Sequence, residues 1–173
     1  MDRNITLFLI RHGETEENRL RILQGHLPGT LTPEGVEAAR ERAEDLANAE
    51  APFDLLLCSD LLRAHRTACI IGERLHLAVR PTPLLRERDW GDFTGEYIPS
   101  LADREWPANV ESAERLLARA RNFLTWVRVT YPDQVVVAVG HGIINKAIQS
   151  VYHQRPMSQI MKMTNAEMRV LML

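Results

Sequence analysis

The chain of 173 residues contains few cysteines and no long apolar run. Its two cysteines, Cys58 and Cys69, form neither a CxxC pair nor a zinc-ligand spacing, which argues against a disulfide scaffold or a zinc domain and favours two reduced thiols in the core. The apolar run from Ile5 to Ile10 is too short for a signal-peptide core or a membrane span. We therefore expect a cytoplasmic protein.

The chain also has no large excess of positive or negative charge. Lysine and arginine total 21 against 23 acidic residues, the net charge is −2, and no run of like charges occurs, so neither nucleic acid nor a membrane surface is an expected partner. Lysine itself is rare, because 19 of the 21 basic residues are arginine and only Lys146 and Lys162 are lysine. This excess reflects either anion sites that need bidentate donors or codon bias.

The composition is that of a soluble globular protein, with 45% hydrophobic and 25% charged residues. The length predicts a single domain over residues 1–173. Residues 81–107 are rich in proline, glycine, tryptophan and charge without a sustained period, which predicts a loop with one short strand. We expect a short lid or loop insertion around residues 86–110.

Short apolar runs alternate with longer stripes of helical spacing along the chain. Residues 5–10, 54–59 and 134–140 have the near-continuous apolar character of parallel strands covered on both faces, and a fourth run occupies 168–173. Helices are predicted after Thr32 and Pro33, after a cap at Ser59 or Asp60, over residues 113–127, and after His141. The alternation predicts an α/β fold, with three layers (α/β/α) and a mostly parallel central sheet.

Three of the predicted strands end in residues suited to binding an anion. They run into Arg11-His12-Gly13, Ser59 to Arg63, and Gly140-His141-Gly142. Ligands of open α/β sheets bind at the carboxyl ends of the strands, and the helix N-termini that follow attract phosphate. A lone histidine at such a place is usually structural, and a pair could hold a metal, but adjacent arginines repel cations. The combination favours a phosphate site without a metal.

The ordered motifs resemble the histidine phosphatases, also called the phosphoglycerate mutase-like superfamily, whose hallmark is Arg-His-Gly after the first strand. The resemblance spans nearly the whole chain. The matching segments are residues 9–15 (LIRHGET) with Asn18, 24–25 (QG), 31–35 (LTPEG), 59–64 (SDLLRA) with Thr67 and Ala68, 85–91 (LRERDWG) with Gly95 and Glu96, 111–112 (ES) and 139–142 (VGHG).

The resemblance implies a role for each matching residue. His12 would be the nucleophile that forms a phosphohistidine, with its other ring nitrogen donating to a nearby backbone carbonyl. Glu87 would be the general acid and base, although an ordinary ion pair with Arg86 or Arg88 is the alternative, and Asp89 and Asp92 are weaker candidates. The phosphate itself would be held by Arg11, Asn18, Gln24, Arg63 and His141. No metal or other cofactor is expected.

The family contains phosphatases and mutases, which differ in how well they exclude water. Only 53 residues separate Glu87 from His141, and a predicted helix occupies much of that span, so little chain remains for a closing lid. Gln24 and Ile143 also depart from the mutase pattern, which has a small hydroxyl residue and an asparagine there. We expect a phosphatase acting on small-molecule phosphomonoesters. A mutase-type phosphotransferase and a non-catalytic phosphate-sensing module are the alternatives.

Overall fold

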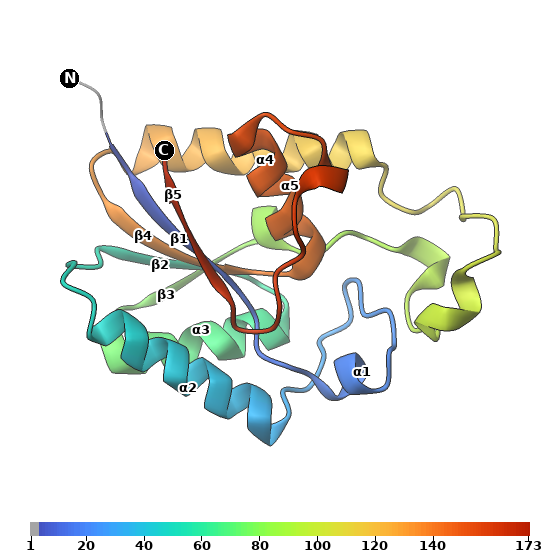
Figure 1. The fold of residues 1–173 in the computed structure, drawn as a ribbon, viewed down its shortest axis with the longest axis horizontal. Helices are drawn as coiled ribbons and strands as arrows, with labels where there is room; N and C mark the ends of the chain where they lie inside the picture. Colours follow the sequence, from blue (N-terminus) through green and yellow to red (C-terminus); the bar gives the residue numbers. More distant parts are fainter. Residues whose placement is uncertain (1–3) are drawn as a thin grey trace.

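The computed structural model describes residues 4–173, and in this part of the chain a five-stranded, mostly parallel sheet forms the centre (Figure 1). The strand order is β3-β2-β4-β1-β5, and β5 runs antiparallel to its neighbour β1. The strands are β1 (Thr6–Arg11), β2 (Leu55–Ser59), β3 (Val79–Thr82), β4 (Val135–Gly140) and β5 (Met168–Met172). Because β4 lies between β1 and β2 and is parallel to both, the carboxyl ends of these three strands meet at one edge.

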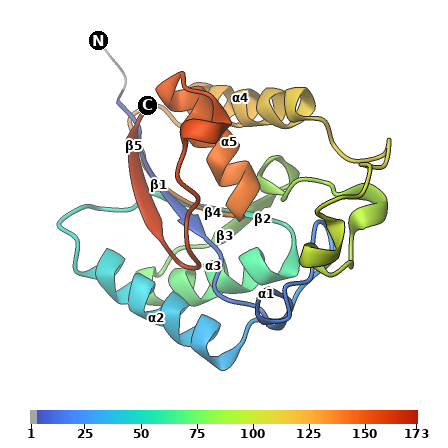
Figure 2. The same ribbon diagram turned by 45° about the vertical axis from the view of Figure 1, so that its right-hand side comes forward.

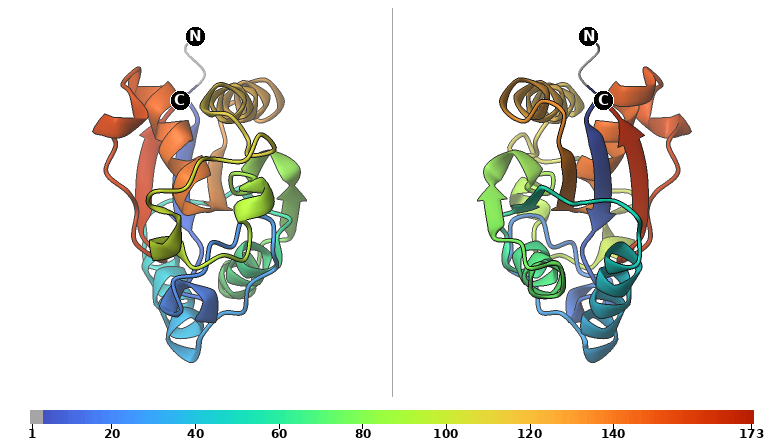
Figure 3. Two further views of the ribbon diagram at one scale, coloured as in Figure 1. Left: turned by 90° about the vertical axis from the view of Figure 1, so that its right-hand side faces the viewer. Right: turned by 90° about the vertical axis from the view of Figure 1, so that its left-hand side faces the viewer.

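Two long helices cover each face of the sheet. Helices α2 (Pro33–Ala47) and α3 (Leu62–Leu75) lie together on one face, and α4 (Ala113–Thr130) and α5 (Gly142–His153) lie on the other (Figures 1 and 2). The predicted three-layer α/β/α fold is therefore confirmed. The view along the sheet from the end that carries α1 (Glu16–Arg19) shows the loops gathered over the strand ends (Figure 3, left).

The core is divided between the two faces by the alternation of side chains along each strand. All residues of β2 are buried; Leu55 and Leu57 pack with α4 and α5, whereas Leu56 and Cys58 pack with α2 and α3. A strand covered on both faces needs apolar residues at every position, which is why these runs are continuous in the sequence. No helix within residues 4–173 combines the length and the apolarity that crossing a membrane requires.

Several local features differ from the predictions. The helix α1 was not predicted; it has four residues and is held by a capping box between Thr15 and Asn18. One short strand was predicted within residues 81–107. The strand β3 (Val79–Thr82) begins two residues before that region. Residues 86–110 are not plain loop, because they contain the short 3₁₀ helices η2 (Gly91–Phe93) and η3 (Ile98–Leu101). A lid function for this segment remains a prediction.

Two further expectations were wrong in detail. The start of α3 is not capped by Ser59 or Asp60, since its N-cap is Leu61 and no side chain caps it. Asp60 instead forms an ion pair with Arg86. Of the two cysteines, Cys58 is buried in the core as expected, but Cys69 is only half-buried on α3; both are free thiols.

A close contact between two glycine backbones connects the segment after β1 to the start of α2. A Cβ atom built on Gly35 would lie 2.1 Å from the Glu14 carbonyl oxygen, and one built on Gly13 would lie 2.4 Å from the Gly35 carbonyl oxygen. These obstacles are backbone atoms, which cannot rotate away. Any side chain at either position would push α2 away from the segment that carries His12.

We predict that Gly35→Ala lowers the free energy of unfolding by roughly 1–3 kcal/mol, because the added methyl group overpacks a backbone contact. Urea denaturation would measure the change. The control is Glu41→Ala at an exposed position of the same helix, which should alter stability by less than about 0.5 kcal/mol. Equal stability of the two variants would contradict the importance of this contact.

Candidate active site

The residues predicted to act on a phosphate converge at the edge where β1, β2 and β4 end. A cavity of about 270 Å³ lies there. Six of the seven predicted residues line this cavity: Arg11, His12, Asn18, Gln24, Arg63 and Glu87. The seventh, His141, lies directly behind, with its ring centroid 5.1 Å from that of His12. The structure therefore brings together residues that are spread over 131 positions of the chain, from Arg11 to His141.

His12 follows β1 directly, and its ring is fixed by hydrogen bonds on both nitrogens. Nδ1 lies 2.7 Å from the carbonyl oxygen of Gly13, as the resemblance implied. A carbonyl can only accept, so Nδ1 carries the proton, and Nε2 keeps a lone pair that accepts from Nε of Arg63 at 3.3 Å. Burial, together with the positive charges of Arg63 and Arg11, lowers the pKa of His12 well below its ordinary value. The ring is thus a neutral imidazole with its lone pair held in a fixed direction.

Arg63 is a fully buried cation that contacts both His12 and the loop after α1. Besides the contact with His12, its Nη1 donates to the carbonyl of Leu27 and its Nη2 to the carbonyl of Gly25, at 2.9 Å for the latter. Burial lowers the pKa of Arg63 to about 10, which leaves it charged at neutral pH. Each terminal nitrogen carries a second N–H, so the guanidinium retains donors for an anion.

Arg11 provides the second cation of the site. Its Nη1 donates to the carbonyl of Met163 at 2.7 Å, in the segment before β5. Among the described residues, its buried Nε has no hydrogen-bond partner. Burial lowers the pKa of Arg11, and the negative charges of Glu87 and Glu167 oppose that shift. Arg11 and Arg63 both retain N–H donors near the neutral His12, so together they can bind a dianion.

His141 is positioned by Ser59, a residue whose role the sequence analysis missed. The Nε2 atom of His141 lies 2.8 Å from Oγ of Ser59, and both side chains are completely buried. Burial and the charge of Arg63 lower the pKa of His141 well below its ordinary value. Ser59 ends β2 and His141 follows β4, which is the neighbouring strand. The strand order would have revealed this pair, but the sequence alone does not give the strand order.

Asn18 and Gln24 line the cavity, and both are positioned by hydrogen bonds with Thr15. The amide oxygen of Asn18 accepts from the backbone N–H of Thr15 at 3.1 Å and from Asn165 at 3.2 Å. The amide oxygen of Gln24 accepts from the Thr15 hydroxyl at 3.1 Å. Because both amide oxygens accept hydrogen bonds within the protein, the amide nitrogens of Asn18 and Gln24 are the groups left to donate to an anion. Thr15 and Asn165 were not singled out in the sequence, because each acts through another side chain.

Glu87 lies against the N-terminus of α5, where its carboxylate accepts three backbone N–H groups. Oε2 accepts from Ile143 at 3.1 Å, and Oε1 accepts from Ile144 at 3.0 Å and from Arg88 at 2.9 Å. The side chain is 9% exposed and lines the same cavity as His12. The surface ion pair considered for Glu87 is not found, because Arg86 binds Asp60 and Arg88 donates to the carbonyl of Glu111.

Comparison with known proteins identifies the family. The family model of the histidine phosphatase superfamily (branch 1) matches residues 7–173. The chain belongs to the histidine phosphatase superfamily. The prediction from its motifs is therefore confirmed, as is the assignment to the phosphatase enzymes, because its relatives are named phosphatases.

Individual relatives of this histidine phosphatase carry different names. It is 34% identical over 163 residues to the uncharacterized phosphatase PhoE of Bacillus subtilis, covering 91% of this chain and 83% of that protein. It is 31% identical to the adenosylcobalamin/alpha-ribazole phosphatase of Escherichia coli, covering 82% and 76%. A solved structure of a mycobacterial glucosyl-3-phosphoglycerate phosphatase in complex with VO3 superposes with a TM-score of 0.85 at 29% identity, covering 95% and 90%.

The cavity in this histidine phosphatase also has apolar walls, which we call its mouth. Ile22, Leu23, Trp90, Ile98 and Ile143 form them. Lys162, one of the two lysines, adds a cation at the rim and was not predicted. Within residues 4–173, no group of three or more histidine, cysteine, aspartate or glutamate side chains has the arrangement of a metal site.

We predict that stability falls with acidification below about pH 6.5 because of His12 and His141. In the unfolded chain these rings take up protons below that pH, whereas in the folded protein their pKa values are lowered and they stay neutral. The unfolded state then binds more protons, so the free energy of unfolding falls by up to about 1.4 kcal/mol per pH unit for each ring.

Urea denaturation between pH 7 and pH 5 would measure this slope. His141→Gln should reduce it by the contribution of one ring, whatever its effect on stability at pH 7. The control is His153→Gln at an exposed position at the end of α5. An identical slope in the native protein and in His141→Gln would contradict the prediction.

Proposed function

We propose that the protein is a metal-independent phosphomonoesterase that works through a phosphohistidine on His12. The observation that carries the proposal is the neutral His12 ring, whose Nε2 lone pair lies within 3.3 Å of a buried guanidinium at the base of the cavity. A neutral imidazole is a nucleophile, and the adjacent cations of Arg63 and Arg11 compensate the charge of a phosphoryl group. Such an arrangement needs no metal to neutralise that charge.

In the first step, the N–H of Arg63 Nε turns from Nε2 of His12 to a phosphoryl oxygen, which frees the lone pair. Nε2 then attacks phosphorus, and the bond from phosphorus to the ester oxygen breaks. This step uses the protonated form of Glu87, which gives its proton to the leaving oxygen, so an alcohol departs and the carboxylate that accepts the backbone N–H groups is left. The hydrogen bond from Nδ1 to Gly13 supports the positive charge that the ring acquires. Arg11, Arg63, Asn18 and Gln24, which line the cavity, would hold the phosphoryl oxygens during this transfer, together with His141, whose ring centroid lies 5.1 Å from that of His12.

In the second step, Glu87 takes a proton from water and the resulting hydroxide attacks phosphorus. The bond from phosphorus to Nε2 breaks, and the ring returns to its neutral form as inorganic phosphate leaves. The same carboxyl thereby acts first as an acid and then as a base, and the cycle restores the starting state.

The side chains at the mouth favour small organic phosphomonoesters as substrates. The apolar wall of Ile22, Leu23, Trp90 and Ile98 can pack against the carbon skeleton of the alcohol part of an ester, and it suits a second charged group less well. Two of the relatives are named for different compounds, adenosylcobalamin/alpha-ribazole and glucosyl-3-phosphoglycerate, so the proposal specifies the ester class and not one compound.

The proposal predicts that His12→Ala loses at least about 10³-fold in kcat/KM towards 4-nitrophenyl phosphate, because no other residue can take the nucleophile's place. The assay is run in excess EDTA, in which the native protein should keep its activity. His153→Ala, prepared in the same way, is the control for contaminating phosphatases. Loss of native activity on chelation, or equal activity of native protein and His12→Ala, would refute the metal-independent histidine mechanism.

A covalent intermediate should also be detectable. Mixing the protein with excess substrate and quenching in alkali, where phosphohistidine survives, should give a species heavier by one phosphoryl group, with the modification mapped to His12 by peptide mass spectrometry. His12→Ala should give none. A protein that binds inorganic phosphate by calorimetry but shows neither turnover nor this species would be a phosphate-sensing module instead, and one that passes the group to an added alcohol in preference to water would be a phosphotransferase.

A further inference from the structure

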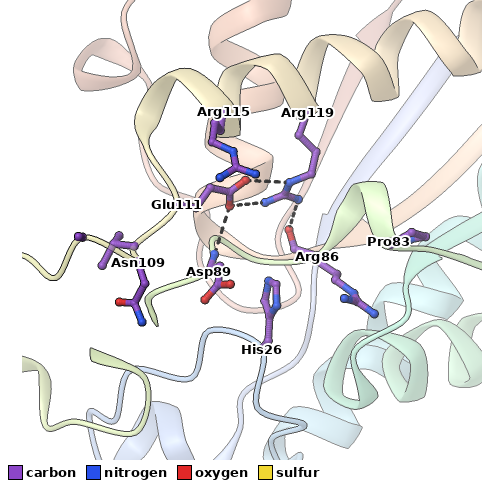
Figure 4. Close-up of a pocket in the computed structure, with 10 residues that line it drawn as sticks. His26, Pro83, Arg86, Asp89, Asn109, Glu111, Arg115 and Arg119 are labelled. Atoms are coloured by element: carbon purple, nitrogen blue, oxygen red, sulfur yellow. Dashed lines mark hydrogen bonds and ion pairs between the residues drawn. The ribbon is translucent and has the colours of Figure 1, made fainter. Parts of the chain in front are cut away.

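The most buried ion pair among the described residues lies outside the cavity and is not used by the mechanism above. It joins Arg119 of α4 to Glu111, which immediately precedes the N-cap of that helix, and the two side chains are 18% and 15% exposed. The pair is bidentate, with Nη2 of Arg119 2.8 Å from Oε1 of Glu111 and Nε 3.1 Å from Oε2 (Figure 4).

Arg119 also holds the backbone that carries Glu87. Its Nη1 donates to the carbonyls of Leu84, at 3.1 Å, and Arg86, and its Nη2 donates to the carbonyl of Glu87 at 3.4 Å. A guanidinium has five N–H donors, and here all five are directed at Glu111 or at the backbone of residues 84–87. A lysine has one nitrogen and could not bind these acceptors together.

Glu111 holds the same segment from the other side of Glu87. Its carbonyl accepts from Nε of Arg88 at 2.8 Å, its Oε1 accepts from the N–H of Asp89 at 3.2 Å, and its own N–H donates to the carbonyl of Asp89 at 2.8 Å. The two members of the ion pair therefore bind the chain immediately before and immediately after Glu87. His26 adds one contact, with Nε2 2.9 Å from the Glu87 carbonyl oxygen.

The space behind this segment is not filled by packed side chains. A cavity of about 320 Å³, separate from the catalytic one, is lined by His26, Arg86, Asp89, Glu111 and Arg119 (Figure 4). Packing alone thus does not prevent residues 86–89 from moving outward. The hydrogen bonds of Arg119 and Glu111 oppose that movement along the backbone of residues 84–89. The Arg86–Asp60 pair, His26 and the N-terminus of α5 restrain the same segment at single residues.

We propose that the Arg119–Glu111 pair is a positioning device that holds the Glu87 carboxyl within reach of the ester oxygen that leaves. The inference rests on the acid role proposed for Glu87 and assigns a function to two residues that touch neither substrate nor His12. A displacement on the order of 1 Å at a reacting group costs about 10²-fold in rate, so loosening this segment should impair proton transfer specifically.

The test compares two substrates that differ in their need for an acid. 4-Nitrophenyl phosphate has a leaving group that departs readily without a proton, whereas a simple alkyl phosphate requires one. We expect Arg119→Met to lower kcat/KM for the alkyl phosphate about 10-fold to 100-fold and to lower that for 4-nitrophenyl phosphate much less, so that the ratio of the two changes at least about 10-fold. Glu87→Gln should change the ratio in the same direction, and adding Arg119→Met to Glu87→Gln should change it no further.

The controls separate positioning from folding. Arg121→Met removes an exposed arginine from the same helix and should leave the ratio unchanged. Arg119→Lys keeps the charge but not the fork and should behave as Arg119→Met does. Glu111→Gln loosens the pair from the other side and replaces Arg119→Met as the decisive variant if the latter does not fold.

The outcomes distinguish this inference from the proposed function. A changed ratio in Glu87→Gln with an unchanged ratio in the Arg119 and Glu111 variants overturns the positioning role and leaves the mechanism standing. An equal loss on both substrates in those variants also overturns it, because a merely structural role predicts that result. An unchanged ratio in Glu87→Gln itself refutes the acid role of Glu87, and the positioning role with it.

Discussion

The candidate site depends on the hydrogen bonds made by the buried guanidinium of Arg63. Taking a cation out of water is costly unless its donors are satisfied, and here the backbone carbonyls of Gly25 and Leu27 supply the acceptors. The loop after α1 is therefore held over the strand ends because a charge on α3 needs its carbonyls. Burial, followed by the charges of Arg63 and Arg11, keeps the His12 ring neutral, and Arg63 gives its lone pair a partner. Arg63 thus contributes to the position of the loop, the protonation state of His12 and the affinity for an anion.

A second constraint comes from the sheet itself. The antiparallel β5 returns along β1, and the segment before it brings Met163 and Asn165 to the site from near the end of the chain. Met163 accepts from Arg11, and Asn165 donates both to the His12 carbonyl and to Asn18. The segment before the last strand thus completes a site that begins at the end of the first strand. The site therefore uses residues from almost the full length of the chain.

Much of this organisation could be predicted from the sequence, because it depends on local patterns. Continuous apolar runs predicted the positions of β1, β2 and β4, since strands covered on both faces tolerate few polar residues, and a fourth apolar run predicted the edge strand β5. Thr32 followed by Pro33 predicted the start of α2, and the structure shows the Thr32 hydroxyl accepting from the N–H of Gly35. The motifs at the strand ends then indicated which residues share the cavity, because parallel strands place their carboxyl ends together.

The parts that could not be predicted depend on contacts between distant segments. The strand β3 contains Pro81 and lies at the sheet edge, so its pattern is not that of a covered strand. The helix α1 is too short to show a period and forms through the capping box of Thr15. Ser59 was interpreted as a helix cap because its neighbours in sequence suggested one, whereas its partner His141 is 82 residues away. Arg119 is an ordinary arginine on an amphipathic helix until the fold brings residues 84–87 beside it.

The chemistry of the two cysteines has a consequence for how such an enzyme responds to oxidation. Thiolates, not thiols, react with peroxides, and burial raises the pKa of Cys58 to about 12 and also raises that of Cys69. On the proposed mechanism the nucleophile is a ring nitrogen, which peroxide does not oxidise under the conditions that convert catalytic thiolates to sulfenic acids. On that mechanism the enzyme would keep its activity under oxidative conditions that inactivate phosphatases with a cysteine nucleophile, and the supply of ester rather than the redox state of its surroundings would govern its activity.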